Sequence, residues 1–142
     1  MKQVTFMSRH RAQALVPPCF SAIISISTPG VSFPVLSDKW HAVFQWHRAD
    51  DDSPMTEQEV QAIWDFVNRH KELTFYVHCD AGISRSAAVA SFIGTLLDCV
   101  VVGLDCDTVI HANAVIKAAL MHGLWERQFK EDHIERLCFG KQ

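Results

Sequence analysis

The sequence predicts an α/β fold: a single domain whose central, mostly parallel sheet has helices on both faces. Short runs rich in β-branched residues alternate along the chain with stretches whose apolar residues recur at helical spacing. The composition, with 49% hydrophobic and 20% charged residues, is that of an ordinary globule with a sizeable core. No repeat, linker or low-complexity tract divides the 142 residues, so we expect one domain over 1–142.

The strands are predicted from short apolar runs. The run at 21–27, SAIISIS, is bounded by the turn residues Thr28, Pro29 and Gly30 and indicates a buried strand. Apolar residues partly alternate with polar ones over 40–48. Two shorter strands are expected over 4–7 and 73–77. One or two turns of helix are expected over 9–15, before Pro17-Pro18 interrupts the chain.

The helices are predicted from caps and spacing. Thr56 and Glu59 form a capping-box pattern ahead of a helix that should end near His70. Small residues favour a second helix over 86–98, followed by a loop at 103–107. Asp107 is expected to cap a third helix that ends at Gly123, and a last helix is expected over 124–137.

The stretch His-Cys-Asp-Ala-Gly-Ile-Ser-Arg-Ser at 78–86 carries the strongest functional signal. A turn between a strand and a helix presents successive backbone N–H groups, and the helix N-terminus adds positive dipole, so this segment can hold a phosphate. Those donors would stabilise the thiolate of Cys79, the form that attacks an electrophile. Arg85 can grip two phosphate oxygens with its planar fork. Gly82 permits a positive φ or a close backbone approach.

This stretch resembles the signature of the cysteine-dependent protein tyrosine phosphatase superfamily, H-C-x-x-G-x-x-R-[S/T], at every defining position. Chain length and element order are similar to the compact dual-specificity type; the resemblance is specific over 50–97 and general elsewhere. It implies hydrolysis through a phosphocysteine intermediate, with Cys79 as nucleophile and a Ser86 hydroxyl that helps the sulfur leave. His78 would support the loop and the thiolate. The phosphate-binding residues would be Asp80, Ala81, Gly82, Ile83, Ser84 and Arg85.

The resemblance also implies a general acid, an aspartate in a loop between an upstream strand and the next helix. Asp50, Asp51 and Asp52 occupy that context. We expect Asp50 to be the acid, because it is the first carboxyl group after the predicted strand, with Asp51 and Asp52 as alternatives. An acid is required because an alkoxide or phenolate leaves poorly without a proton.

Three further polar residues have open roles. His47 and Arg48 flank the acidic loop, where they could contact substrate or simply be solvated. Asn113 lies where related phosphatases often carry a Pro-Asn pair, but the proline is absent. Ser86 could alternatively cap the helix that it begins.

Composition and charge indicate which binding partners and which cellular setting to expect. The net charge of −3 favours neither nucleic acid nor an anionic membrane, and no apolar run approaches membrane-spanning length. The N-terminal residues lack the order of a secretion signal, and the five scattered cysteines include no C-x-x-C pair, so we expect a reduced, cytoplasmic setting. The histidines show no metal-ligand spacing, and we expect neither metal nor cofactor. We expect a monomer that acts on phosphorylated protein.

The classical tyrosine-specific branch of the superfamily has an added loop that deepens the pocket for phosphotyrosine, and no such loop is recognisable in 1–46. The resemblance therefore implies a shallower pocket, with phosphotyrosine and also phosphoserine and phosphothreonine as expected substrates. None of the variable residues in the phosphate-binding stretch, Asp80, Ala81, Ile83 and Ser84, is basic, and Asp80 argues against polyanionic substrates. Two alternatives stay open. One is a phosphatase for a non-protein ester such as a phosphoinositide, an RNA end or a small molecule. The other is a catalytically weak module that binds phosphorylated partners.

Overall fold

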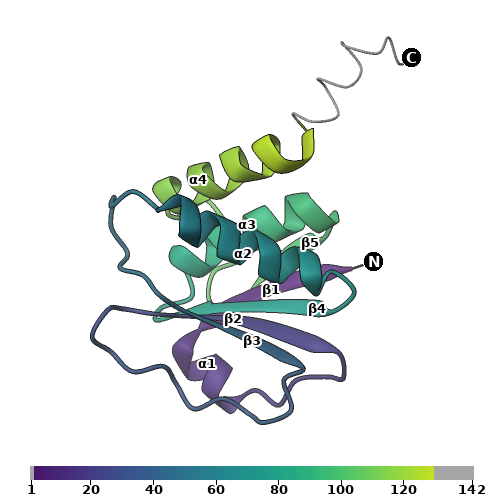
Figure 1. The fold of residues 1–142 in the computed structure, drawn as a ribbon. Coiled ribbons are helices and arrows are strands. Elements are labelled where there is room, and N and C mark those ends of the chain that lie inside the picture. Colours follow the sequence, from purple (N-terminus) through teal and green to yellow (C-terminus); the bar gives the residue numbers. More distant parts are fainter. Residues whose placement is uncertain (1, 130–142) are drawn as a thin grey trace.

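The computed structural model describes residues 2–129, and its centre is a five-stranded sheet in which every strand pair is parallel (Figure 1). The strand order is β3-β2-β4-β1-β5. The strands are β1 (Gln3–Ser8), β2 (Ser21–Ser27), β3 (Ala42–His47), β4 (Thr74–Cys79) and β5 (Val100–Gly103). Because all strands run the same way, their carboxyl ends meet at one edge of the sheet.

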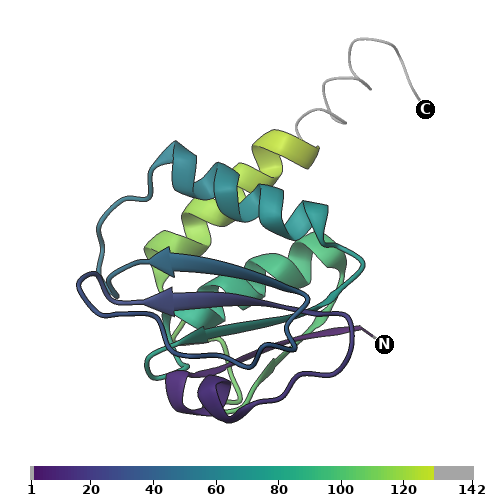
Figure 2. The same ribbon diagram turned by 60° about the horizontal axis from the view of Figure 1, so that its bottom comes forward.

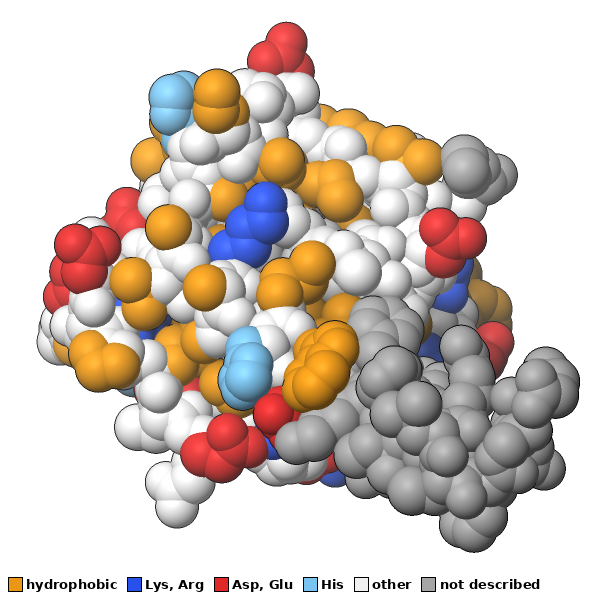
Figure 3. Space-filling view, turned by 90° about the horizontal axis from the view of Figure 1, so that it is seen from above, with side chains coloured by type: hydrophobic (Ala, Val, Ile, Leu, Met, Phe, Trp, Pro, Cys, Tyr) orange, Lys and Arg blue, Asp and Glu red, His pale blue; other side chains and the backbone are white. Residues whose placement is uncertain are grey.

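Helices cover both faces of the sheet, as predicted, but unequally. Helices α2, α3 and α4, which we call the three-helix layer, lie on one face, and the short α1 lies on the other (Figures 1 and 2). The helices are α1 (Arg9–Ala14), α2 (Glu57–Arg69), α3 (Arg85–Leu97), α4 (Ala114–Leu124) and the π-helical turn η1 (Trp125–Phe129). On the outside of the three-helix layer, apolar side chains lie interspersed with polar and charged ones (Figure 3). None of the helices within residues 2–129 is long and apolar enough to cross a membrane.

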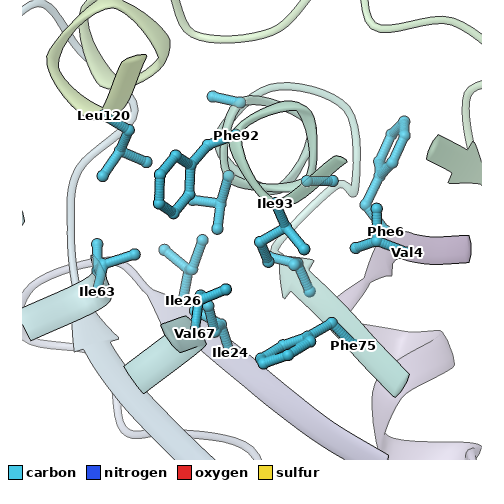
Figure 4. Close-up of a cluster of buried hydrophobic side chains, with 14 of the residues drawn as sticks. Val4, Phe6, Ile24, Ile26, Ile63, Val67, Phe75, Phe92, Ile93 and Leu120 are labelled. Carbon is cyan, nitrogen blue, oxygen red and sulfur yellow. The ribbon is translucent and has the colours of Figure 1, made fainter. Parts of the chain in front are cut away.

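The main core lies between the sheet and the three-helix layer. Phe92 and Ile93 of α3 point into it together with Ile24, Ile26 and Phe75 of the sheet (Figure 4). Successive side chains of a strand point to opposite faces, so Ile23 instead joins a smaller cluster under α1, which contains Met7, Ala12, Ile23 and Trp40. β2 is therefore buried throughout, which explains its uninterrupted small and apolar sequence.

The capping box predicted for α2 is present. The backbone N–H of Glu59 donates to Thr56 Oγ1 at 3.1 Å, and the N–H of Thr56 donates to Glu59 Oε1 at 2.9 Å. α2 ends at Arg69 with His70 as its C-cap, as expected. The cap fixes where the acidic loop at 50–55 ends and the helix begins.

The C-terminal half differs from the sequence prediction in two places. β5 was not predicted, because an edge strand of four half-exposed residues carries no buried pattern. The next helix begins at Ala114 rather than after Asp107, since the Asn113 side chain accepts the hydrogen bond from Ile116 N at 3.0 Å and caps it. Of the helix expected over 124–137, the structure has η1 up to Phe129, and the remainder lies outside the described residues.

Candidate functional site

The signature stretch lies between β4 and α3, as predicted. β4 ends at Cys79, α3 begins at Arg85, and the residues between them, 80–84, form a loop that we call the cradle. β4 lies between β2 and β1 in the sheet, so the cradle is at the centre of the carboxyl edge. This edge is where open α/β sheets bind ligands.

Gly82 packs the cradle onto the end of β1. Its φ is +74°, and a Cβ at this position would lie 2.3 Å from the backbone nitrogen of Ser8 and 2.4 Å from the carbonyl carbon of Met7. Both predicted reasons for a glycine, the left-handed conformation and the close backbone approach, therefore apply at once. The N–H of Arg9 adds a hydrogen bond to the carbonyl of Asp80 at 3.2 Å.

The backbone N–H groups of the cradle are available to a ligand. Within residues 2–129, none of the N–H groups of 80–84 donates a hydrogen bond to another group of the protein. The first turn of α3 contributes further N–H groups without helical acceptors, together with the positive end of the helix dipole. A set of donors with this chemistry favours an oxyanion such as phosphate.

Cys79 lies at the base of this loop. Its side chain is 2% exposed, and Sγ lies 3.1 Å from Ser86 Oγ, a hydrogen-bonding distance for sulfur. Ser86 is fully buried in the first turn of α3, and the N-cap position belongs to Ser84. The Ser86 hydroxyl is thus placed toward the sulfur rather than used as a helix cap.

Arg85 is 5% exposed, and most of its guanidinium N–H groups donate hydrogen bonds to protein acceptors. Nη1 donates to the carbonyl of Arg48 at 2.5 Å and to Thr28 Oγ1 at 3.2 Å, while Nη2 donates to Asp80 Oδ2 at 3.1 Å. Nε is buried and has no hydrogen-bond partner in the described chain. A buried guanidinium N–H without an acceptor is costly, so a bound oxyanion would relieve it.

His78 supports the cradle from the side of β2. Nε2 lies 2.5 Å from Ser25 Oγ, and Nδ1 lies 3.4 Å from the carbonyl oxygen of Cys79. The ring is fully buried, and burial lowers the pKa of His78 to about 4. His78 is therefore neutral near pH 7, and it contacts its neighbours through hydrogen bonds rather than placing a positive charge beside Cys79.

The acidic loop meets the cradle through Asp50. Oδ1 of Asp50 accepts hydrogen bonds from Ser84 Oγ at 2.7 Å and from Asn113 Nδ2 at 2.9 Å. Oδ2 makes no hydrogen bond to the described residues and stays free. Asp51 is different: the Ser53 N–H donates to its Oδ1 at 3.0 Å, and this bond lowers the pKa of Asp51. Asp52 is exposed.

Two residues with open roles hold the acidic loop. Asn113 Nδ2 also donates to the Asp51 carbonyl at 3.1 Å, so Asn113 joins the start of α4 to this loop. Arg48 is 5% exposed; its Nη2 donates to the Ser53 carbonyl and lies 3.9 Å from Asp51 Oδ1. Arg48 therefore helps to hold the acidic loop, while its Nε is buried and has no hydrogen-bond partner among the described residues. The exposed His47 packs against Phe33, with ring centroids 4.2 Å apart and the rings tilted by 36°.

Sequence reasoning missed Thr28. This residue follows β2, and its hydroxyl contacts both Arg85 and Asp80. The available signal was topological: β2 and β4 are parallel neighbours, so the residues that follow them meet. Among the described residues, no group of three or more His, Cys, Asp or Glu side chains could hold a metal ion.

No family model matches the sequence, and no curated protein matches it. Among solved structures, the fold is similar to that of human tyrosine phosphatase-like serine/threonine/tyrosine-interacting protein. The match covers 81% of this chain and 79% of that chain, with a TM-score of 0.50 and 15% sequence identity. At this identity the likeness shows the fold alone: the chain has the α/β fold of a tyrosine phosphatase-like protein.

Proposed function

We propose that the chain is a phosphatase of the cysteine-dependent, dual-specificity type. It hydrolyses phosphotyrosine on protein substrates, with phosphoserine and phosphothreonine as further substrates, and it works in the cytoplasm without metal or cofactor. One observation carries this proposal: Cys79, the free Nε of Arg85 and the free Oδ2 of Asp50 belong to three segments that hydrogen bonds join at one edge of the sheet.

In the first step the thiolate of Cys79 attacks phosphorus, and the bond from phosphorus to the ester oxygen breaks. The cradle N–H groups and Arg85 bind the phosphoryl oxygens, whose negative charge they stabilise most strongly in the transition state. Asp50 gives its proton to the departing oxygen. The products of this step are the free alcohol or phenol and a phosphocysteine.

In the second step water attacks the phosphocysteine. The carboxylate of Asp50 takes a proton from this water, and the bond from phosphorus to sulfur breaks. The Ser86 hydroxyl donates a hydrogen bond to the departing thiolate, a role that its 3.1 Å distance to Sγ supports. Inorganic phosphate leaves, and Asp50 is protonated for the next cycle.

Asp50 is the best supported of the three aspartates. It is joined to the cradle through Ser84, whereas the Asp51 carboxyl group accepts its hydrogen bond from Ser53 N–H within the acidic loop and makes none to the cradle among the described residues.

The nucleophile is tested with Cys79→Ser. This variant should lose hydrolysis of an aryl phosphate, keep the wild-type melting temperature and still bind tungstate. Wild-type protein quenched in acid during turnover should carry one phosphoryl group on Cys79, detectable by mass spectrometry. Turnover that persists in the variant would contradict the covalent mechanism. Wild-type protein that binds phosphotyrosine peptide without hydrolysing it would identify a binding module instead.

The acid is tested with Asn at each of positions 50, 51 and 52, assayed on phosphotyrosine and on a fluorinated aryl phosphate whose phenolate leaves without a proton. Asp50→Asn should slow phosphotyrosine hydrolysis by about a hundredfold and the activated ester far less. It should also flatten the basic limb of the pH–rate profile. Asp51→Asn and Asp52→Asn are the matched controls. An unchanged ratio of the two rates in Asp50→Asn would remove Asp50 from this role.

A further inference from the structure

Thr28, Asp80 and Arg85 form a closed ring of hydrogen bonds beside the cradle. Thr28 Oγ1 donates to Asp80 Oδ2 at 3.0 Å and accepts from Arg85 Nη1 at 3.2 Å, and Arg85 Nη2 donates to the same Asp80 oxygen at 3.1 Å. Thr28 follows β2 and Asp80 follows β4, so two neighbouring parallel strands supply the ring.

The ring accounts for one side of the guanidinium. Of the five N–H groups that an arginine carries, those on Nη1 are directed to Thr28 and the Arg48 carbonyl, and one on Nη2 is directed to Asp80. The groups that remain are Nε–H, buried and without a partner, and the second N–H of Nη2. In a planar guanidinium these two can act as a fork for two oxygens of one phosphoryl group.

We infer that Thr28 and Asp80 are positioning residues that fix Arg85 with its Nε–Nη2 edge free for the phosphoryl group before substrate binds. This inference rests on the proposed function and adds two residues to it. A long arginine side chain without the ring would have several rotamers, and binding would have to select one of them at a cost in affinity and rate. A group held in its productive orientation needs no such reorganisation in the transition state.

The charge of Asp80 fits this role. Although partial burial raises the pKa of Asp80, hydrogen bonds from Arg85 and Thr28 and the nearby arginine charges outweigh it and hold that pKa below its usual range. An ionised carboxylate accepts stronger hydrogen bonds than a neutral one, so it holds the guanidinium firmly. The Asp80 side chain remains 45% exposed.

The threonine is tested by Thr28→Val, which keeps the shape and removes the hydroxyl, beside Thr28→Ser, which restores it. In Thr28→Val we expect kcat/KM for an aryl phosphate to fall by about tenfold and the tungstate dissociation constant to rise by a similar factor, the size of one well-placed hydrogen bond to a charged group. Thr28→Ser should recover most of both losses. Thr95→Val is the matched control, because the Thr95 hydroxyl on α3 donates to the Ser91 carbonyl and, among the described residues, makes no hydrogen bond to Arg85 or the cradle.

The carboxylate is tested by Asp80→Ala and Asp80→Asn, with Asp65→Asn as the control. Asp65 lies on α2, accepts a hydrogen bond from Gln61 Nε2 at 2.8 Å, and makes none to Arg85 or the cradle among the described residues. Asp80→Ala should lose more than about tenfold in kcat/KM, and Asp80→Asn, which keeps an acceptor oxygen, should lose less. The control should behave as wild type.

A double-mutant cycle separates positioning from a merely structural effect. If Thr28 acts through Arg85, Thr28→Val should cost nothing further once Arg85 is replaced by Ala, measured with the activated ester or as tungstate affinity. An equal loss in both backgrounds, or wild-type tungstate affinity in a folded Thr28→Val protein, would overturn the inference. Tungstate binding makes this test independent of turnover, so a protein that binds oxyanions without hydrolysis would defeat the proposed function and leave the ring testable. Wild-type protein that binds no tungstate would defeat both.

Discussion

The cradle and the acidic loop meet at Asp50 but are held in place by different means. The cradle is held through its backbone: Gly82 lies against β1, Arg9 N–H binds the Asp80 carbonyl, and Asn113 N–H binds the Ser84 carbonyl at 3.1 Å. The acidic loop is held mainly by the side chains of Arg48, Asn113 and Ser84. Backbone packing fixes a shape, whereas side-chain hydrogen bonds on an exposed loop can exchange with water. The difference matches the two roles that we propose, since phosphate binding needs fixed donors and proton transfer needs an acid that can approach the leaving group.

Gly82→Ala should have the largest effect, because it attacks the backbone contact directly. The added methyl group would overlap the Ser8 and Met7 backbone, and φ would stay left-handed, so we expect a loss of at least about 3 kcal/mol in the free energy of unfolding and loss of oxyanion binding. Urea denaturation and tungstate titration measure both. Gly30→Ala is the control: its φ is +85° but nothing lies within 4 Å, so it should cost only about 1 kcal/mol. Equal effects of the two substitutions would remove the special role of the β1 contact.

Replacing each buried arginine by lysine compares the two loops at the level of charge. Arg85→Lys loses the fork that faces the phosphoryl group, and kcat should fall by about a hundredfold or more. Arg48→Lys keeps the charge and can still donate to the Ser53 carbonyl, so its cost should be about tenfold at most. Steady-state kinetics on an aryl phosphate measures both. A larger loss of kcat in a folded Arg48→Lys protein than in Arg85→Lys would contradict this comparison.

The cradle side should also respond to pH through His78. The folded pKa of about 4 lies below the ordinary 6.5, so this histidine contributes no pH dependence above about pH 6.5, where it is neutral in both states. As pH falls from 6.5 toward 4, the unfolded chain binds a proton that the folded chain does not, and stability should fall by up to about 1.4 kcal/mol per pH unit. Urea denaturation between pH 7.5 and 5 should show this slope. In His78→Gln the number of protons taken up on unfolding should be smaller by about one, and the slope correspondingly shallower. An identical slope in the wild type and the His78 variant would contradict the assignment.

Asn113 offers the smallest and most selective test on the acidic-loop side. Asn113→Ala removes both the cap of α4 and the donor to Asp50, so we expect about 1 kcal/mol less stability and roughly tenfold slower phosphotyrosine hydrolysis. Asn113→Asp keeps an acceptor for Ile116 N but places a carboxylate beside Asp50. This variant should regain the stability and not the activity. Full activity in Asn113→Asp would mean that the amide does not position the acid.

The sequence predicted the features that depend on neighbours along the chain. The strand, cradle and helix around Cys79, the capping box at Thr56 and the buried run of β2 all carry local patterns. Features that depend on distant segments escaped prediction. Thr28 contacts Arg85, which lies far along the sequence, and the preference for Asp50 rested only on its place after the strand, with no sign of its bonds from Ser84 and Asn113. β5 is defined by its pairing with β1. Asn113, rather than Asp107, caps α4, and its position depends on the backbone hydrogen bond from Asn113 N–H to the Ser84 carbonyl of the cradle.

The contact between Gly82 and β1 has a consequence for how the protein reaches its folded state. β1 begins the described chain, yet it lies between β4 and β5 in the sheet, and the Ser8 beneath Gly82 is paired with Cys79 from far along the sequence. A partly folded chain without this strand would have nothing for the signature loop to close upon. Contacts between residues so distant in sequence form slowly, because a long loop must close first. During refolding, oxyanion binding should therefore appear with the slowest phase and after most helical signal has returned, so that the cradle around Cys79 is assembled only when the sheet is complete.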